Sequence, residues 1–317
     1  MADYRAFFVT DIHASDRCFR KFLNAARFYD CKVLIMGGDM TGKMLVPIIA
    51  RGKSSFSTRL FGRDRTVSED ELPGLRKLIA DAGYYAYDTT PDEIEALEHD
   101  RGGVDLLFQK AISDMIERWL ALAEERLKDS PAMCIMGPGN DDPDFVDEAL
   151  RDSDRVINPE GSVVELPGGF NMISVGYSNP TPWDSPRELP EDQLLERIDT
   201  EVSKLGDTSH AIFNLHVPPK DTKLDQAALL DGELRPVIKS GLPIITGVGS
   251  SAVRSAIERH QPMLTLHGHI HESRAGIKMG RTHALNPGSE YSEGVLRGAI
   301  ITLSPSKGVK GYQLVAG

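Results

Sequence analysis

Five short apolar runs in this chain each end in a residue whose side chain can bind a metal ion. In chain order, the residues at these run ends are Asp11, Asp39, Asn140, His216 and His267. Short apolar runs bounded by turn residues are typical of buried strands. In open α/β sheets, ligands bind just beyond the carboxyl ends of the strands. We therefore expect these five run ends to meet and to form a shared metal site.

Further histidines stand next to these positions. Asp11 and His13 are separated by one residue, so that both side chains can point to one place just past a strand. His267, His269 and His271 alternate, which places them on one face of an extended backbone. With Asp39, Asn140 and His216, the sequence offers more candidate ligands than a single tetrahedral ion requires.

The ligand types indicate which ions and which chemistry such a site would support. Neutral imidazole with carboxylate and amide oxygen suits Mn, Fe, Zn, Co or Ni more than Ca or Mg alone. One bridging carboxylate would let seven ligands furnish two sites, and two ions about 3.5–4 Å apart serve hydrolytic displacement at phosphorus. Two divalent ions carry four positive charges, of which Asp11 and Asp39 cancel only two. The remainder favours an anionic substrate and a metal-bound hydroxide.

The elements that position these residues begin with a β-α-β unit. A strand at 5–10, a helix at 15–29 and a strand at 32–36 predict a parallel pair with a crossover helix. After a long interruption, the pattern resumes with strands expected at 132–136, 162–166, 170–176, 211–215, 242–246 and 263–266. Four short strands are expected in the tail, between residues 274 and 315.

The interruption, residues 43–130, is far longer than a connection between a strand and a helix requires. The patterns within it predict a hairpin from 46–52 and 57–67, a helix over 68–83 and a long amphipathic helix over 104–130. We expect a mainly helical insertion that packs as a cap near the metal site. Its arginines Arg59, Arg63 and Arg65 could clamp a phosphate over the metals or stand on a solvated hairpin.

Composition argues against several other classes of protein. The chain has 317 residues, of which 40% are apolar and 26% charged, as in ordinary soluble proteins. A formal net charge of -11 argues against stable binding to nucleic acid or to an anionic membrane. Three cysteines are too few for a disulfide framework. The sequence shows neither a signal-peptide pattern nor an apolar run of about 20 residues. A cytoplasmic location is therefore expected. An oligomer is compatible with the sequence.

Together, the candidate residues resemble the motif series of the calcineurin-like metallophosphoesterase superfamily. The series comprises D-I-H at 11–13, G-D at 38–39, G-N-D at 139–141, His216, G-H-I-H at 268–271 and N-P-G-S at 286–289. The resemblance extends from the first strand to about residue 303, without the insertion. The segment 176–192 also resembles predicted phosphoesterases related to the Icc cyclic-nucleotide phosphodiesterase.

The resemblance implies a fold and a role for each matching residue. The fold would be α/β, a four-layered α/β/β/α sandwich of two mixed sheets formed by residues 1–317, with 43–130 inserted. A hydroxide bridging the two metals would attack phosphorus in line with the leaving oxygen, and Asn140 could also touch a phosphate oxygen. The implied ligands are Asp11, His13 and His271 for the first metal, Asp39 as the bridge, and Asn140, His216 and His269 for the second.

One position departs from the family pattern. Many members have a histidine after the asparagine, which is read as the general acid, whereas this chain has Asp141. An aspartate donates a proton at neutral pH only if its pKa is well raised. Either Asp141 is tuned in this way, or the leaving group needs little help, or another residue such as His267 supplies the proton. His267 does not match a family ligand and is expected to play a supporting or structural part.

The sequence thus predicts an enzyme, a dinuclear-metal phosphoesterase that hydrolyses a small anionic phosphomonoester or phosphodiester. Asn140 and Asp141 are its candidate catalytic residues. The alternative is a non-catalytic scaffold or binding module on the same fold. Such a protein should have gaps in its ligand set, and the motif series of this chain has none.

Overall fold

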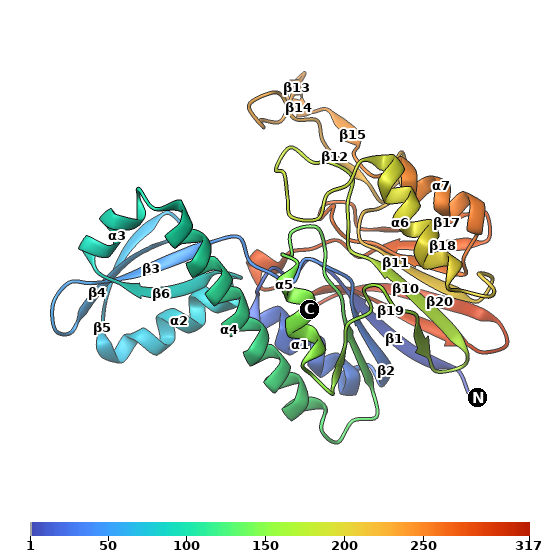
Figure 1. The fold of residues 1–317 in the computed structure, drawn as a ribbon, viewed down its shortest axis with the longest axis horizontal. Helices are drawn as coiled ribbons and strands as arrows, with labels where there is room; N and C mark the ends of the chain where they lie inside the picture. The colour runs from blue at the N-terminus through green and yellow to red at the C-terminus, as the bar shows by residue number, and fades with distance from the viewer. Residues whose placement is uncertain (1) are drawn as a thin grey trace.

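The computed structural model describes residues 2–317 and contains two six-stranded sheets that pack face to face, with helices outside (Figure 1). This arrangement confirms the predicted four-layered α/β/β/α sandwich. The first sheet has the order β20 (Gly308–Ala316), β19 (Arg297–Ser304), β1 (Tyr4–Val9), β2 (Cys31–Met36), β7 (Met133–Met136) and β8 (Val156–Ile157). The second has the order β17 (Ala275–Met279), β18 (Thr282–Asn286), β16 (Leu264–Leu266), β11 (Ala211–Leu215), β10 (Phe170–Val175) and β9 (Val164–Leu166).

Both sheets are mixed: the parallel strands reach one edge of the first sheet and form the centre of the second. In the first sheet β1, β2, β7 and β8 are parallel, while β19 pairs antiparallel with β1, and β20 pairs antiparallel with β19. In the second sheet β10, β11, β16 and β18 are parallel, while β9 and β17 run antiparallel. Each parallel group therefore ends at one edge, where loops from several strands converge.

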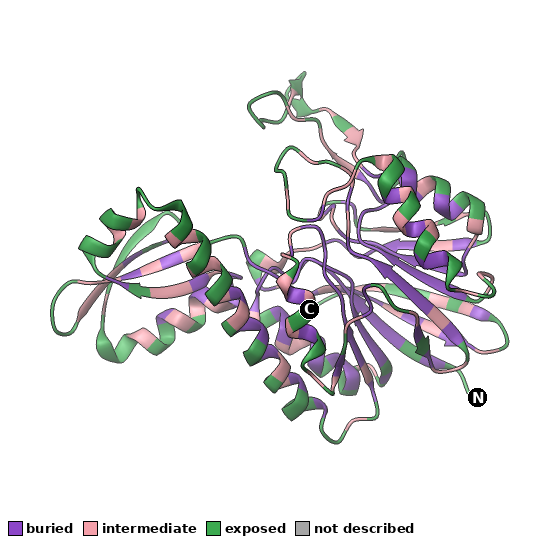
Figure 2. Cartoon of the chain, in the orientation of Figure 1, coloured by how far each residue is buried: buried purple, intermediate pink, exposed green. Residues whose placement is uncertain are grey.

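Three separate apolar layers hold the sandwich together. The helices α1 (Asp16–Phe28) and α5 (Phe145–Arg151) cover the first sheet, and α6 (Glu191–Ser203) and α7 (Ser251–His260) cover the second. Because side chains alternate along a strand, Phe7 of β1 packs under α1 while Phe8 packs between the sheets. The inner strands β1, β2, β10, β11 and β16 are accordingly buried almost throughout, whereas the edge strands β17 and β20 are not, as Figure 2 shows.

The insertion between β2 and β7 has a sheet of its own. This sheet has the order β5 (Arg63–Ser68), β4 (Ser55–Leu60), β3 (Leu45–Ala50) and β6 (Tyr85–Thr89), accompanied by α2 (Leu72–Asp81), α3 (Pro91–Leu97) and α4 (Arg101–Leu127). The segment 57–67, expected as one arm of a hairpin, instead turns back at Phe61 and Gly62. Both residues have positive φ, 52° and 72°, as a two-residue hairpin turn requires.

The helix α4 joins the insertion to the sandwich. The Trp119 ring stacks on Phe19 of α1 at a centroid distance of 4.1 Å, and its indole donates to Asp16 Oδ1 at 2.7 Å. At the end of α2, the buried Asp81 pairs with Arg20, and its carbonyl accepts a hydrogen bond from Ser15 Oγ at 2.8 Å. These contacts fix the insertion against α1.

A second excursion, which we call the finger, comprises residues 226–247. It contains two narrow antiparallel ladders, β12 (Gln226–Ala228) with β15 (Ile245–Gly247) and β13 (Ile238–Lys239) with β14 (Leu242–Pro243). The strand expected at 242–246 is therefore divided between β14 and β15. In Figure 1 the finger projects from the sandwich near α7. Within residues 2–317, no helix combines the length and apolar character that a membrane span requires.

Candidate metal centre

The structure brings the seven predicted ligands together where the parallel strands of both sheets end. The first sheet supplies Asp11 and His13 after β1, Asp39 after β2 and Asn140 after β7; the second supplies His216 after β11 and His269 and His271 after β16. The ligand atoms of six of them form two compact groups, each with all atoms within 4.8 Å of one another: Asp11, His13 and His271, and Asp39, His216 and His269.

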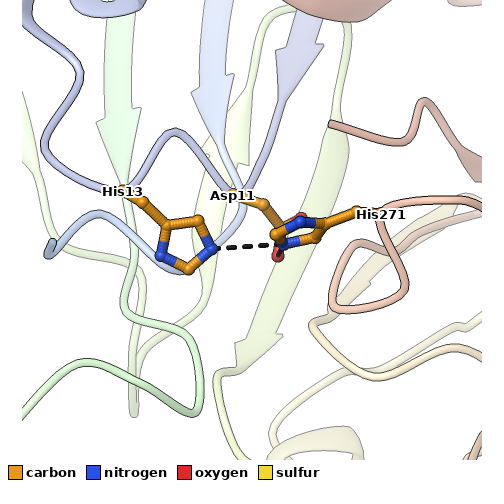
Figure 3. A group of neighbouring side chains, drawn as sticks. All are labelled: Asp11, His13 and His271. Carbon is orange, nitrogen blue, oxygen red and sulfur yellow. Dashed lines mark hydrogen bonds and ion pairs between the residues drawn. The ribbon is translucent and has the colours of Figure 1, made fainter. Parts of the chain in front are cut away.

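The first group has the spacing of ligands around one ion. His13 Nε2 lies 3.2 Å from His271 Nε2, and His271 Nε2 lies 3.4 Å from Asp11 Oδ1 (Figure 3). Two nitrogens bound tetrahedrally at about 2.0–2.1 Å would lie roughly 3.3 Å apart. The side chains of this group can therefore hold a cation without rearrangement.

The second group includes Asn140, and Asp39 lies between the two groups. His269 Nδ1 lies 2.6 Å from Asn140 Oδ1, and His216 Nε2 lies 3.4 Å from Asp39 Oδ1. The other oxygen of the same carboxylate, Asp39 Oδ2, lies 3.8 Å from His13 Nε2 of the first group. One carboxylate thus faces both groups, which is the placement that a bridging ligand needs.

The hydrogen bonds of the histidines fit metal binding. His13 Nδ1 faces the Thr41 carbonyl at 3.1 Å, and His216 Nδ1 faces the Gly37 carbonyl at 3.4 Å. Because a carbonyl only accepts, each Nδ1 carries the proton, and each Nε2 presents its lone pair to the site. Among the described residues, His216 Nε2 is buried without a hydrogen-bond partner. A buried nitrogen in this state is costly unless a cation or a proton occupies the position beside it.

Four of the ligands have left-handed backbone conformations. The φ angles are 53° at Asp11, 39° at His13, 51° at Asp39 and 65° at His269. Each such residue other than glycine costs roughly 1 kcal/mol or more, and such strain clusters at functional sites. The surrounding loops thus impose these conformations and aim the side chains inward.

Glycines beside the ligands permit the close approach of the loops. A Cβ at Gly268 would collide with Thr10 Oγ1 and with the Asp11 carboxylate. A Cβ at Gly139 would collide with Asp39. The glycines in the G-N-D and G-H-I-H motifs are therefore required by packing against the opposite ligand loop.

Burial sets the electrostatics of the centre. It raises the pKa of Asp39 to about 7 and lowers the pKa of His13 and of His269 to about 3, which keeps both rings neutral and able to ligate. Burial also opposes charge on His216, but the Asp39 carboxylate beside it raises the pKa of this histidine to about 9. A proton on His216 thus compensates the buried carboxylates in the position that a cation would take.

Two supporting residues were not identified from the sequence as individual contributors. The buried Asp142 carboxylate accepts hydrogen bonds from the backbone N–H groups of Met40, Thr41 and Gly139, at 3.1, 2.8 and 2.8 Å, and so ties the Asp39 and Asn140 loops together. Asn286, at the start of N-P-G-S, donates to the carbonyls of Gly268 and Ile270 at 3.2 and 3.1 Å. Their signals in the sequence are the second aspartate of G-N-D-D and the N-P-G-S motif.

The two candidates for a general acid have different surroundings. Although burial opposes ionisation, the Lys43 ammonium that pairs with Asp141 lowers the pKa of this carboxyl, the opposite of what a general acid needs. His267 uses both ring nitrogens: Nδ1 donates to the Leu215 carbonyl at 2.7 Å, and Nε2 accepts from Thr265 Oγ1 at 2.8 Å. His267 therefore connects β16 to β11 and has no nitrogen left for a metal.

Asn140 is fixed by the segment that resembles the Icc-related proteins. Its Nδ2 donates to Ser185 Oγ at 2.7 Å and to Asp141 Oδ1 at 3.1 Å. Ser185 Oγ donates in turn to Glu188 Oε1 at 2.5 Å. Both N–H groups of the amide are thus used within the protein, so that contact with a phosphate oxygen would have to replace one of these bonds.

The metal centre lies in a cleft of about 1130 Å³. Its lining includes Asp39, Asn140, His269 and His271, and also Phe108 and Ile112 of α4. Among residues 2–317, Arg59, Arg63 and Arg65, for which the sequence left a phosphate clamp and a solvated hairpin open, are absent from this lining. They stand on β4 and β5 at the outer part of the insertion.

Two solved structures align with nearly the whole chain. One crystal structure matches with a TM-score of 0.58 and 13% identity, covering 99% of this chain and 98% of its own. The crystal structure of TT1561 of Thermus thermophilus matches with a TM-score of 0.54 and 13% identity over the same shares. The two-sheet sandwich and the ordered ligand series at its strand ends decide which fold this is. The chain has a calcineurin-like α/β sandwich fold.

Sequence comparison adds one relative with a partial match. No family model matches the sequence. The uncharacterized protein MJ1162 of Methanocaldococcus jannaschii is 29% identical over 157 residues, which are 49% of this chain and 62% of the relative. The match therefore spans less than two thirds of that relative. These likenesses show a shared fold, whereas a reaction has to be argued from the residues of the candidate metal centre.

Proposed function

We propose that the protein is a metal-dependent phosphoesterase that hydrolyses a phosphomonoester or phosphodiester with two divalent transition-metal ions, Mn, Fe, Zn, Co or Ni. The observation that carries this proposal is the position of Asp39, whose two carboxylate oxygens face the two histidine groups at 3.4 and 3.8 Å. The donor set of imidazole, carboxylate and amide oxygen suits these metals.

Each residue of the centre has a distinct part in this proposal. Asp11, His13 and His271 would hold one ion, and Asn140, His216 and His269 the other, with Asp39 shared. When bound, such a pair of ions supplies the positive charge that activates water and stabilises a phosphoryl group during transfer. Lys43, held by Asp141 at the edge of the centre, adds a cation that can bind a phosphate oxygen.

The protonation states in the centre bear on how the leaving group departs. Because the Asp141 carboxylate is ionised beside Lys43, it is not available to protonate a leaving oxygen near neutral pH. His267 is fixed by its two hydrogen bonds. The reaction is therefore expected to favour alcohols that leave as stable anions, such as phenols. The cytoplasmic location expected from the sequence stays a prediction.

The test combines metal analysis with hydrolysis of 4-nitrophenyl phosphate and bis(4-nitrophenyl) phosphate. The metal-loaded protein should release nitrophenol, and Asp39→Ala should lose both turnover and metal content. Asp64→Ala, a change of an exposed aspartate in the insertion, is the matched control and should retain both. If fully loaded protein fails against broad monoester and diester panels, the alternative of a non-catalytic binding module is correct.

A further inference from the structure

The cleft at the metal centre is far larger than a phosphate group needs. Its volume is about 1130 Å³, and the residues of the metal centre occupy only one part of its lining. Sites for small molecules commonly have volumes of about 300–1000 Å³. The cleft therefore has room for a whole substrate, so that most of its surface must contact the part of the substrate beyond the phosphate.

Two walls of the cleft beyond the centre carry large apolar side chains. One wall is the segment 179–186, with Trp183 and three prolines, and another is the base of the finger, with Leu229, Leu230 and Leu234. Trp183 is 64% exposed, Leu229 39% and Leu234 45%. Large apolar side chains gathered at a concave surface next to a reactive centre indicate a binding surface for an apolar group.

The segment that carries Trp183 is fixed by hydrogen bonds. The Glu188 carboxylate accepts hydrogen bonds from the backbone N–H of Thr181 at 2.8 Å and of Ser185 at 2.9 Å. The backbone N–H of Trp183 donates to Thr181 Oγ1 at 3.2 Å. The exposed indole is thus presented by an ordered turn, and binding against it costs little additional ordering of the protein.

The lining residues of the finger carry no charge, whereas other parts of the lining include Asp184, Glu191, Lys220 and Glu272. Lys43 stands at the metal centre, paired with Asp141, where a phosphate would lie. Leucine and proline side chains offer no hydrogen-bonding group, so the edge of a nucleobase buried against the finger would lose its hydrogen bonds to water. An aliphatic chain buried there loses none.

We propose that this cleft selects a phosphate ester whose organic group is a long aliphatic chain, which lies along Trp183 and the leucines of the finger while the phosphate lies at the metal centre. The inference rests on the proposed phosphoesterase function and adds the class of substrate. It assigns Trp183, Leu229 and Leu234 as residues that determine specificity.

Two series of substrates test the inference with the metal-loaded protein. The first is 4-nitrophenyl alkyl phosphodiesters with methyl, butyl and octyl groups, and the second is phenyl phosphates with the same groups in the para position. In the first series the leaving group, 4-nitrophenol, is kept. In the second the leaving group is always a para-alkylphenol, whose pKa hardly changes with chain length, so chain length is the main variable in both series. A buried methylene contributes up to about fourfold in binding, so we expect kcat/KM to rise at least tenfold from methyl to octyl in one of the two series.

Variants locate the effect on the cleft. Trp183→Ala and the double variant Leu229→Ala/Leu234→Ala should each lower the ratio of octyl to methyl kcat/KM several-fold. All three residues are substantially exposed, so folding should be retained, and each variant is an independent test. The matched control is Leu242→Ala, because Leu242 is 71% exposed on the same finger but lies outside the cleft lining. It should keep the ratio of the unchanged protein.

The outcomes separate this inference from the proposed function. Hydrolysis of the methyl compounds with no gain along either series would overturn the inference and leave the phosphoesterase function intact. A ratio that does not change in the Trp183 and leucine variants would also overturn it. If loaded protein hydrolyses no member of either series, the proposed function itself fails.

Discussion

Asn140 Nδ2 lies 2.7 Å from Ser185 Oγ, although the two residues are 45 positions apart in the chain. This bond fixes which way the amide points. With the nitrogen directed to Ser185, the oxygen Oδ1 faces His269 Nδ1 at 2.6 Å, where the second group of ligands converges. The segment 176–192 therefore acts on the metal centre through the orientation of a single amide.

Removal of the Ser185 hydroxyl should weaken one metal site more than the other. In Ser185→Ala the Asn140 amide can rotate, so we expect the affinity of the second ion to fall by about 10- to 100-fold, as for other residues that orient ligands. The metal stoichiometry at limiting free metal measures this change. Ser185→Thr retains a hydroxyl and should restore binding, and Ser306→Ala is the surface control. Equal loss of both ions would contradict the assigned orientation role.

Lys43 should affect substrates through its charge. In Lys43→Met the ammonium beside Asp141 is lost, and we expect kcat/KM for phosphate esters to fall by roughly tenfold or more, since a cation near the transferring group is removed. Lys43→Arg keeps the charge and should retain most of the activity. Steady-state kinetics with metal content measured in parallel provide the readout. An unchanged kcat/KM in Lys43→Met would show that the cation has no part in binding.

Metal binding should release a proton from His216. In the metal-free protein the Asp39 carboxylate raises the pKa of His216 to about 9, so the ring is protonated near neutral pH, whereas a ligating imidazole must be neutral. The apparent metal affinity should therefore rise with pH up to about 9 and become flat above it. Titration calorimetry in buffers of different ionisation enthalpy counts the released protons. Affinity that is independent of pH from neutral pH upward would contradict this assignment.

Replacement of Gly268 by alanine, the smallest side chain, should destabilise the protein. The Cβ of Gly268→Ala would meet Thr10 Oγ1 and the Asp11 carboxylate, so we expect a loss of about 1–3 kcal/mol in the free energy of unfolding and reduced metal content. Gly311→Ala is the matched control, because a Cβ there has open space and should leave both quantities unchanged. Urea denaturation of both variants measures the difference. Equal stabilities would show that the loops at Gly268 can move apart.

The parallel strands and the ends where ligands converge were predictable from the sequence. Runs such as those before Asp11 and Asp39 are apolar because both faces of a central strand are buried, and this pattern is visible without knowledge of tertiary contacts. The ligands come directly after such runs. Because parallel strands end at the same edge of a sheet, the sequence indicated where the ligand side chains would meet. The proximity of the run-end residues and their neighbours was therefore predicted from local patterns, whereas the set of seven ligands without His267 came from the family resemblance.

Other features depend on contacts that local patterns do not encode. The bond between Asn140 and Ser185 joins distant segments, and neither residue type indicates the other. The strand β6 is half-buried and pairs in parallel with β3, from which β4, β5 and α2 separate it in the chain. Its short run shows no clear alternation of apolar and polar side chains. The finger contains strands of two or three residues, which are too short to show a period and are held by turns instead.

The division of the ligands between the two sheets links metal content to the integrity of the sandwich. Asp11, His13, Asp39 and Asn140 follow strands of one sheet, whereas His216, His269 and His271 follow strands of the other. Each proposed ion would thus cross-link two layers whose facing sides meet mainly through apolar packing. A chelator should lower the temperature of unfolding as well as stop turnover, and early opening between the sheets would release both ions at once.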